Sequence, residues 1–445
     1  MYDTVAQYGQ VRGAPIDDWH PPIMVRLWQL LHPLGPGTAP IFALQTALYA
    51  FGFALIAGTL VESGRWRAAL AAAVLALSPL LLGWQMVILK DAQMIGALVA
   101  AFGIVAHYRL TGRSIPVAAG AMVALLVAYA TLVRANAFFV TVPLTPLLLP
   151  TRKRLLMSAA IAAAGAAIVL IVTPLINHDL LGAEPSDVAK SQPLFDLAAM
   201  AIASPASPGP FTPSEIAEIR ARHCVKAFFW DPLGDPTGCT SATERLMHEP
   251  AGWLYVQLAS AAVAHPIAYA RHRIAHWNST ERWLVAPGLP DAAPPVEAEP
   301  NDLGLETPQS PVAGTWQDIA AAEAATPLGW PIFWTIVAAV LLPAAWRRRN
   351  DASGSLALAL IASALALEIS FFAISIASDL RYHLWPMAAS ALALILLSDN
   401  PRLQRREWLA AGLVVALVIG GGTIARAALP PAPDSYQAMI HAASG

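Results

Sequence analysis

Residues 80–102 read LLLGWQMVILKDAQMIGALVAAF, an apolar run whose only charged residues are Lys90 and Asp91. An ammonium and a carboxylate inside such a run are costly in a bilayer unless they are paired or face a water-filled cavity. The pair therefore predicts a turn at the membrane surface between two spanning helices, and a functional role is the first hypothesis for it. The alternative is structural: Lys90 reaches the lipid headgroups while Asp91 caps the following helix.

The remaining sequence has the same apolar character. Of the 445 residues of the whole chain, 57% are hydrophobic and 13% are charged, whereas a soluble domain has roughly 25% charged residues. Because a helix needs about 20 apolar residues to cross a bilayer, this composition predicts an all-α polytopic membrane protein. We expect ten spans, near residues 40–62, 68–83, 92–110, 115–133, 137–150, 155–176, 328–346, 354–377, 383–398 and 407–427. The shortest, 137–150, contains two prolines and is either a span or an irregular segment.

Basic residues recur in every second short loop. They are Arg65 and Arg67; Arg109 and Arg113; Arg152, Lys153 and Arg154; Arg347, Arg348 and Arg349; and Arg402, Arg405 and Arg406. Since Lys and Arg near span ends are retained in the cytoplasm, these five loops are predicted to be cytoplasmic in a multi-pass protein of the inner (plasma) membrane. Lys90, Arg134 and Arg381 then lie on the opposite, extracytoplasmic face, together with both chain ends.

These spans divide the chain into five parts. We expect a first external loop with a surface helix at 1–38, a six-span block at 39–176, a small extracytoplasmic subdomain at 177–327, a four-span block at 328–427 and an external tail at 428–445. The surface helix is predicted at Pro21–His32, where proline fits the first turn and an apolar face follows. Because a polar tail of nearly forty residues precedes the first span, we also expect one further helix upstream of Met1.

The extracytoplasmic insert has its own local signals. Thr212 to Glu215 is a plausible helix start before 216–225, and 251–277 is expected to form one or two amphipathic helices. The alternative for 251–270 is an eleventh span. Cys224 and Cys239 both fall in this insert, so an oxidising compartment and a disulfide between them are predicted; two unpaired thiols are the alternative.

The polar residues of the predicted external face are scattered along the sequence. The first loop carries Asp3, Asp17, Asp18 and His20, which offer a general base or a metal site near the bilayer edge; an ordinary solvated loop is the alternative. No glycine-rich phosphate loop, nucleophile elbow or basic tract is present, so nucleic acid is not an expected partner. The histidines between 265 and 276 share one helical stripe and are expected to pack rather than bind a metal.

Two later turns add isolated arginines. Arg134 and Asn136 interrupt TLVRANAFF, and Arg381-Tyr382 follows Asp379. The guanidinium group binds phosphate through a planar, permanently charged fork, so these arginines together with Lys90 suit a lipid phosphate or pyrophosphate. Interfacial anchoring is the alternative for each residue taken alone.

At these residues the chain resembles the GT-C superfamily of membrane glycosyltransferases, in particular the protein O-mannosyltransferases and bacterial lipid A aminoarabinose transferases. An acidic residue followed by a D-x-H-P-P turn into a surface helix, here Asp3 and residues 18–22, is similar to the family's first external loop. The Lys-Asp, Arg-x-Asn and Arg-Tyr turns are also similar. Where the family usually has Asp-Glu, this chain has Asp3-Thr4.

The resemblance implies transfer of a sugar, with inversion, from a polyprenyl-phosphate donor to an acceptor glycan, lipid or protein on the external face. It implies that Asp3 is the catalytic base, that Asp18 and His20 shape the acceptor side, and that the donor phosphate is held by Lys90, Arg134, Arg381 and Tyr382. Asp91 and Asn136 would support these residues. Asp17 and Asp18 are the alternatives for the base, and any divalent metal would be held by Asp3, Asp18 and His20.

Two other functions stay open at this point. Glu368, inside LALEISFFAI, is a carboxylate in the middle of a predicted span, and ionisable groups at the bilayer midplane are typical of transporters. A transporter or flippase of a lipid-linked glycan is therefore the alternative function. The third hypothesis is an inactive scaffold of the same fold.

Overall fold

The computed structural model describes residues 2–148, 155–204, 209–295, 297–305, 310–398 and 405–442, and this part of the chain is built of helices with two isolated β-bridges. The first half contains α1 (Tyr2–Val11), α2 (Pro22–Leu31), α3 (Ala39–Glu62), α4 (Trp66–Ala76), α5 (Pro79–Gln85), α6 (Lys90–Leu110), α7 (Val117–Val133), α8 (Phe138–Leu148) and α9 (Leu155–Pro174). The second half contains α10 (Ser191–Ala203), α11 (Pro213–Ala221), α12 (Thr240–Met247), α13 (Ala251–Ala264), α14 (Pro266–Thr280), α15 (Pro311–Ala325), α16 (Pro331–Arg347), α17 (Ala352–Ile374), α18 (Leu384–Leu397), α19 (Arg405–Ala428) and α20 (Tyr436–His441).

Six helices of the described chain are long and apolar enough to cross a membrane. They correspond to the predicted spans at 40–62, 92–110, 155–176, 354–377, 383–398 and 407–427. The predicted spans at 115–133 and 328–346 form the apolar helices α7 and α16, which have 17 residues each. The described part of 137–150 is a short 3-10 turn followed by α8, and residues 149 and 150 lie outside the described ranges. An all-α membrane protein is thus supported, whereas ten full-length spans are not.

The predicted span at 68–83 is broken in the structure, and its two pieces together are long and apolar enough for one bent span. The segment is divided into α4 and α5, which are bent by 54° relative to each other. Pro79 begins α5, and proline cannot continue a helix because it lacks an N–H and its ring clashes with the preceding turn. The carboxylate of Glu323 in α15 accepts hydrogen bonds from Ser78 Oγ (2.8 Å) and Leu80 N (2.9 Å), so the new helix start is capped.

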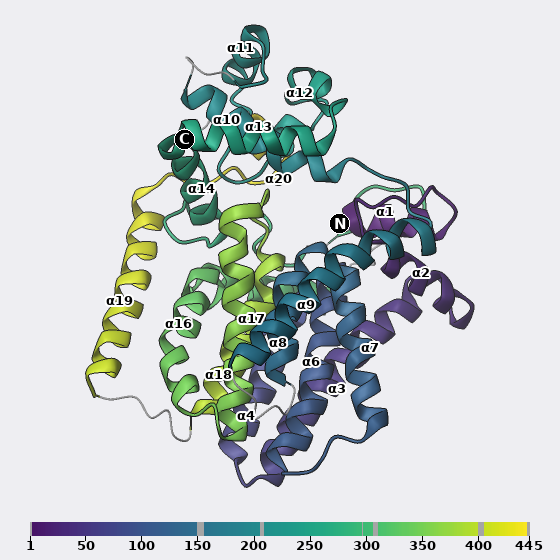
Figure 1. The fold of residues 1–445 in the computed structure, drawn as a ribbon, viewed down its shortest axis with the longest axis vertical. Coiled ribbons are helices and arrows are strands. Elements are labelled where there is room, and N and C mark those ends of the chain that lie inside the picture. The colour runs from purple at the N-terminus through teal and green to yellow at the C-terminus, as the bar shows by residue number, and fades with distance from the viewer. Residues whose placement is uncertain are drawn as a thin grey trace.

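The core of the bundle depends on close approach between α3 and α6. A Cβ atom on Gly52 would lie 2.5 Å from the carbonyl carbon of Val99, and one on Gly103 would lie 2.8 Å from the Gly52 oxygen. Small residues allow such contact between spanning helices. Since α6 begins at Lys90, its close packing on α3 (Figure 1) fixes the position of Lys90 and Asp91 along the bundle.

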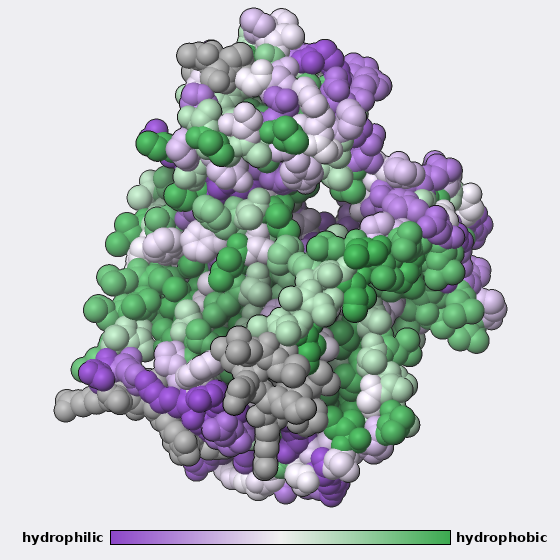
Figure 2. Space-filling view, viewed as in Figure 1, coloured by the Kyte–Doolittle hydropathy of each residue, from purple (hydrophilic) through white to green (hydrophobic). Residues whose placement is uncertain are grey.

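Arginine-bearing loops lie together at the opposite end. Arg65, after α3, donates to the Leu396 oxygen at the end of α18 (2.9 Å), and Arg109, at the end of α6, donates to Ser355 Oγ at the start of α17 (2.8 Å). Figure 2 shows hydrophilic residues at this lower end and hydrophobic residues around the middle of the molecule. The described basic loops therefore lie at one end of the helical bundle, and the turn with Lys90 and Asp91 lies at the other end.

A group of helices from the insert, α10–α14, packs above the bundle (Figure 1) around its own cluster of buried apolar side chains. The predicted helices after Thr212 and across 251–277 are present as α11, with a capping box, and as α13 and α14. Cys224 and Cys239 form a disulfide in this group.

Five described helices were missed by the sequence analysis, namely α1, α10, α12, α15 and α20. Residues 2–11, expected to be loop, form α1, which packs on the predicted helix α2 through Tyr8 and Trp28, with ring centroids 5.3 Å apart. Hydropathy does not reveal α1 because the face it buries is polar and includes Asp3, Gln7 and Gln10. Another missed helix, α15, follows a proline-rich stretch.

Candidate functional site

Helix α1 brings Asp3 to the start of α6. Thr4 Oγ1 donates a hydrogen bond to the carbonyl oxygen of Ile88 (2.8 Å). The same turn is held from α3, because Gln45 Nε2 donates to the oxygens of Gln85 (2.6 Å) and Val87 (2.9 Å). Buried amide and hydroxyl groups with satisfied hydrogen bonds fix geometry, so this turn sets the positions of Asp3 and Lys90 relative to each other.

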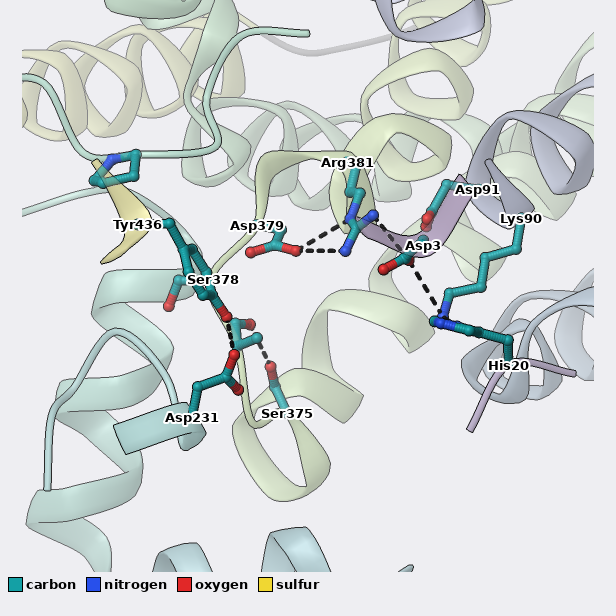
Figure 3. A network of polar contacts seen from close by, with 12 residues as sticks. Asp3, His20, Lys90, Asp91, Asp231, Ser375, Ser378, Asp379, Arg381 and Tyr436 are labelled. Atoms are coloured by element: carbon teal, nitrogen blue, oxygen red, sulfur yellow. Dashed lines mark hydrogen bonds and ion pairs between the residues drawn. The ribbon is translucent and has the colours of Figure 1, made fainter. Parts of the chain in front are cut away.

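The Asp3 carboxylate lies between two cations. Its Oδ2 is 3.0 Å from Arg381 Nη1 and 3.5 Å from Lys90 Nζ. Arg381 also bonds Asp379 Oδ2 through Nε (3.0 Å) and Nη2 (2.9 Å), so it bridges two carboxylates (Figure 3). Burial alone would raise the pKa of Asp3, but the charges of Arg381 and Lys90 outweigh burial and hold that pKa well below its usual range. Asp3 is therefore ionised at neutral pH.

His20 is the third group of this corner. Its Nδ1 is 2.9 Å from Lys90 Nζ. Burial, with the neighbouring charge of Lys90, lowers the pKa of His20 to about 3. The imidazole is then neutral, so Nδ1 accepts from the Lys90 ammonium and Nε2 carries the hydrogen. Nε2 is buried without a hydrogen-bond partner in the described chain. His20, Lys90 and Arg381 thus present N–H donors around Asp3.

Arg134 lies one layer behind this corner. Its Nη1 is 2.8 Å from Asp91 Oδ2 and its Nε is 2.9 Å from Asn136 Oδ1. The guanidinium also stacks on the ring of Tyr382, with its Cζ 4.3 Å from the ring centroid. Asp91 neutralises Arg134, and Arg134 in turn supports Tyr382. Among the predicted phosphate ligands, Lys90, Arg381 and Tyr382 line the cavity described below, but Arg134 does not.

Asp18 is placed away from Asp3, so the structure does not support its predicted part in a catalytic or metal site. Asp18 Oδ1 accepts from the Ser186 backbone N–H (2.7 Å) and hydroxyl (2.5 Å), and Oδ2 is 3.5 Å from His178 Nε2. These contacts attach the first loop to the segment that follows α9. No group of three His, Cys, Asp or Glu side chains in the described ranges is arranged to hold a metal ion. The two cations already beside Asp3 also oppose a metal there.

A cavity of about 1020 Å³ opens in front of the corner. Asp3, Asp17, His20, Lys90 and Arg381 line one part of it. The remaining wall comes from the insert and the C-terminal segment, and includes Trp230, Asp231, Asp291, Ser435 and Tyr436. Figure 2 shows a hollow between the upper helical group and the part of the molecule that carries α1, just above the hydrophobic band.

No family model, curated protein or solved structure matches the chain. Its chemistry therefore has to be inferred from the side chains of the cavity.

Several lining residues were missed by the sequence analysis. Trp230-Asp231 lies in the insert and Tyr436 in the tail, and nothing local in the sequence distinguishes them from surface residues. Burial raises the pKa of Asp231 to about 6, and burial together with Asp379 raises the pKa of Asp291 to about 7. Asp291 also has a positive φ of 54°, which is uncommon outside glycine. Perturbed carboxylates in a cleft are typical of functional sites.

Proposed function

We propose that this protein is an inverting glycosyltransferase that moves a sugar from a polyprenyl-phosphate donor to an acceptor on the extracytoplasmic face of the membrane. The observation that carries the proposal is the Asp3 carboxylate between Lys90 and Arg381 on the wall of a large cavity. The Asp3 carboxylate lies at the end of the bundle opposite the arginine-bearing loops, which supports an extracytoplasmic location of the site.

The corner suits a phosphate group. Arg381 offers a planar fork and Lys90 a compact charge, both of which bind phosphate oxygens, and the Nε2–H of neutral His20 has no partner in the described chain. These donors are preorganised, since Asp379 and Asp3 already hold Arg381 in place. Fixed positive charge of this kind stabilises a departing phosphate in the transition state.

Donor binding would also make Asp3 a better base. In the free protein its pKa is held low by the two cations. The donor is a phosphodiester with one negative charge, which offsets part of the positive charge of Lys90 and Arg381, so the pKa of Asp3 rises when the donor arrives. The acceptor hydroxyl then loses its proton to Asp3 as its oxygen bonds to the anomeric carbon. The bond from that carbon to the phosphate oxygen breaks, and polyprenyl phosphate leaves with the electron pair.

The direct test is transfer of radiolabelled sugar from polyprenyl-phosphate sugars in proteoliposomes, comparing the chain with Asp3→Asn. We expect the substitution to lower transfer by about 10²–10⁴-fold, the usual contribution of a general base, with the protein still present in the membrane. Asp302→Asn is the matched control, because Asp302 is an exposed carboxylate that does not line the cavity. Unchanged transfer in Asp3→Asn would remove Asp3 as the base.

A lipid-linked glycan transporter is the second candidate, favoured by one observation. Glu368 of α17 is buried in the bundle, where its Oε2 lies 2.8 Å from His383 Nδ1. Ionisable pairs buried inside a bundle of membrane helices often belong to transport or proton pathways. If Glu368→Gln stops translocation of a fluorescent polyprenyl-phosphate glycan while Asp3→Asn does not affect it, the transporter replaces the enzyme.

A further inference from the structure

The wall of the cavity beyond Asp379 differs chemically from the corner around Asp3. Trp19 and Trp230 both line it, with ring centroids 6.4 Å apart. Next to Trp230, the Asp231 carboxylate accepts a hydrogen bond from the Tyr436 hydroxyl. Figure 3 shows Asp231 and Tyr436 on the far side of Asp379 from Lys90 and His20. The cavity therefore has an aromatic and acidic wall in addition to its cationic corner.

This wall does not suit an anionic ligand. The residues that line the cavity include seven carboxyl groups, Asp3, Asp17, Asp231, Asp291, Glu297, Glu299 and Asp379, against the two basic side chains Lys90 and Arg381. Both cations are engaged by Asp3 or Asp379 at the corner. A second phosphate or a uronate on the acidic wall would face more carboxyl groups than basic groups, which costs binding free energy.

One buried oxygen lacks a partner at the junction of the two regions. Asp379 is 4% exposed, and its Oδ2 bonds Arg381, but its Oδ1 has no hydrogen-bond partner in the described chain. An unsatisfied buried acceptor is costly, and a ligand hydroxyl is the neutral group that would satisfy it. Hydroxyls donate strong, charge-assisted bonds to carboxylates, while indole rings pack well against the apolar face of a sugar ring.

We propose that Trp19, Trp230, Asp231 and Tyr436, with Asp379 Oδ1, form the acceptor subsite for a neutral saccharide. The inference rests on the proposed glycosyltransferase function and narrows it: the acceptor is an uncharged glycan rather than a lipid phosphate or a glycan rich in acidic sugars. The insert and α20 hold this subsite together. Lys226 donates to the Ala442 oxygen, and Met439 and Ile440 pack against Phe228 and Phe229.

Ligand binding tests the subsite without requiring turnover. The full chain in nanodiscs is examined by saturation-transfer NMR with neutral methyl glycosides of mannose, glucose, galactose and arabinose, and with glucose 6-phosphate and methyl glucuronide as anionic probes. With the cationic corner saturated by polyprenyl phosphate, we expect at least one neutral glycoside to bind and the anionic probes not to bind. Binding should fall at least fivefold in Trp19→Ala and in Asp231→Asn, and less in Tyr436→Phe.

The controls separate lost binding from lost folding. Trp66→Ala and Asp302→Asn change exposed residues outside the cavity lining and should bind glycoside like the unmodified chain. All variants should retain affinity for polyprenyl phosphate within twofold, and glycoside should bind at the same time as polyprenyl phosphate. Competition between the two would overturn the assignment to the acceptor.

Other outcomes are equally decisive. The subsite is wrong if no neutral glycoside binds the unmodified chain, if the anionic probes also bind when polyprenyl phosphate is saturating, or if glycoside binding survives both Trp19→Ala and Asp231→Asn. Absence of sugar transfer from every donor, with glycoside binding intact and dependent on Asp231, would reject the enzyme and leave the saccharide site in place. The two proposals therefore fail in different experiments.

Discussion

Asp3 and Arg381 are 378 positions apart in the sequence, yet Arg381 Nη1 lies 3.0 Å from Asp3 Oδ2. This contact joins the first helix of the chain to the turn before α18. It also gives Arg381 two carboxylate partners, because the opposite edge of the same guanidinium bonds Asp379. The candidate site therefore depends on a buried charge network as well as on its individual residues.

Removal of Arg381 should destabilise the protein. In Arg381→Met the buried carboxylates of Asp3 and Asp379 lose a shared counterion, and loss of one partner of a buried pair costs about 3–5 kcal/mol. The stability of Arg381→Lys should fall between that of the unmodified chain and that of Arg381→Met, since lysine keeps the charge but cannot bond both carboxylates. Thermal unfolding followed by tryptophan fluorescence checks the order. Equal stability of all three proteins would contradict the network.

Asp3→Asn should strengthen binding of the phosphate group. The substitution removes the anion that occupies Lys90 and Arg381, so a ligand phosphate no longer competes with it. We expect the affinity for polyprenyl phosphate to rise about tenfold, equivalent to about 1.4 kcal/mol, while sugar transfer is lost. Titration in nanodiscs measures this, and Asp302→Asn is the control. Weaker binding in Asp3→Asn would show that the phosphate lies elsewhere.

Thr4 is expected to matter through its hydroxyl. Thr4→Val has nearly the same shape but cannot donate to the Ile88 oxygen, and a typical hydrogen bond contributes about 1 kcal/mol. Helix α1 should become less well fixed, and transfer should fall several-fold. Thr4→Ser should restore most of the activity, because it keeps the donor. If Ser and Val behave alike, the hydrogen bond has no positioning role.

Asp231 should make stability depend on pH. Burial raises its pKa to about 6, above the ordinary value near 3.8, so the folded state holds a proton that the unfolded state has already released. Stability then falls as pH rises from about 4 to about 6 and stays lower above that. Asp231→Asn should remove the part of this slope that Asp231 contributes and stabilise the protein at pH 7 by roughly 2–3 kcal/mol. Thermal unfolding at pH 4 and pH 7 measures the difference, which should vanish at pH 4.

The disulfide should support the upper helices. Its two cysteines are 15 positions apart, and a loop of this size predicts about 3 kcal/mol of stabilisation. Cys224→Ser with Cys239→Ser should lower the unfolding temperature of the α10–α14 group and weaken glycoside binding, since Trp230 and Asp231 lie within the closed loop. Hydrogen exchange of residues 209–247 gives the local readout. Unchanged exchange would show that packing alone holds this segment.

Much of this architecture was readable from sequence. The apolar runs predicted α3, α6, α17 and α19, since about 20 apolar residues suffice to span a bilayer. Local turn signals predicted α2 and α11. Hydropathy did not reveal the break between α4 and α5 at Pro79, and it missed α1, whose buried face is polar.

The sequence by itself also determined which end of the bundle carries the site, because span alternation places Asp3, Lys90, Arg134 and Arg381 on one side. Only the tertiary structure decided which charges meet. Arg134 pairs with Asp91 and lies behind Tyr382, whereas Arg381 pairs with Asp3 and lines the cavity. The physical reason is that hydropathy and helical period are local properties, while the pairing of buried charges depends on how distant helices pack. For the same reason the acidic wall built from Asp231 and Tyr436 became visible only when the insert and the tail were seen to meet.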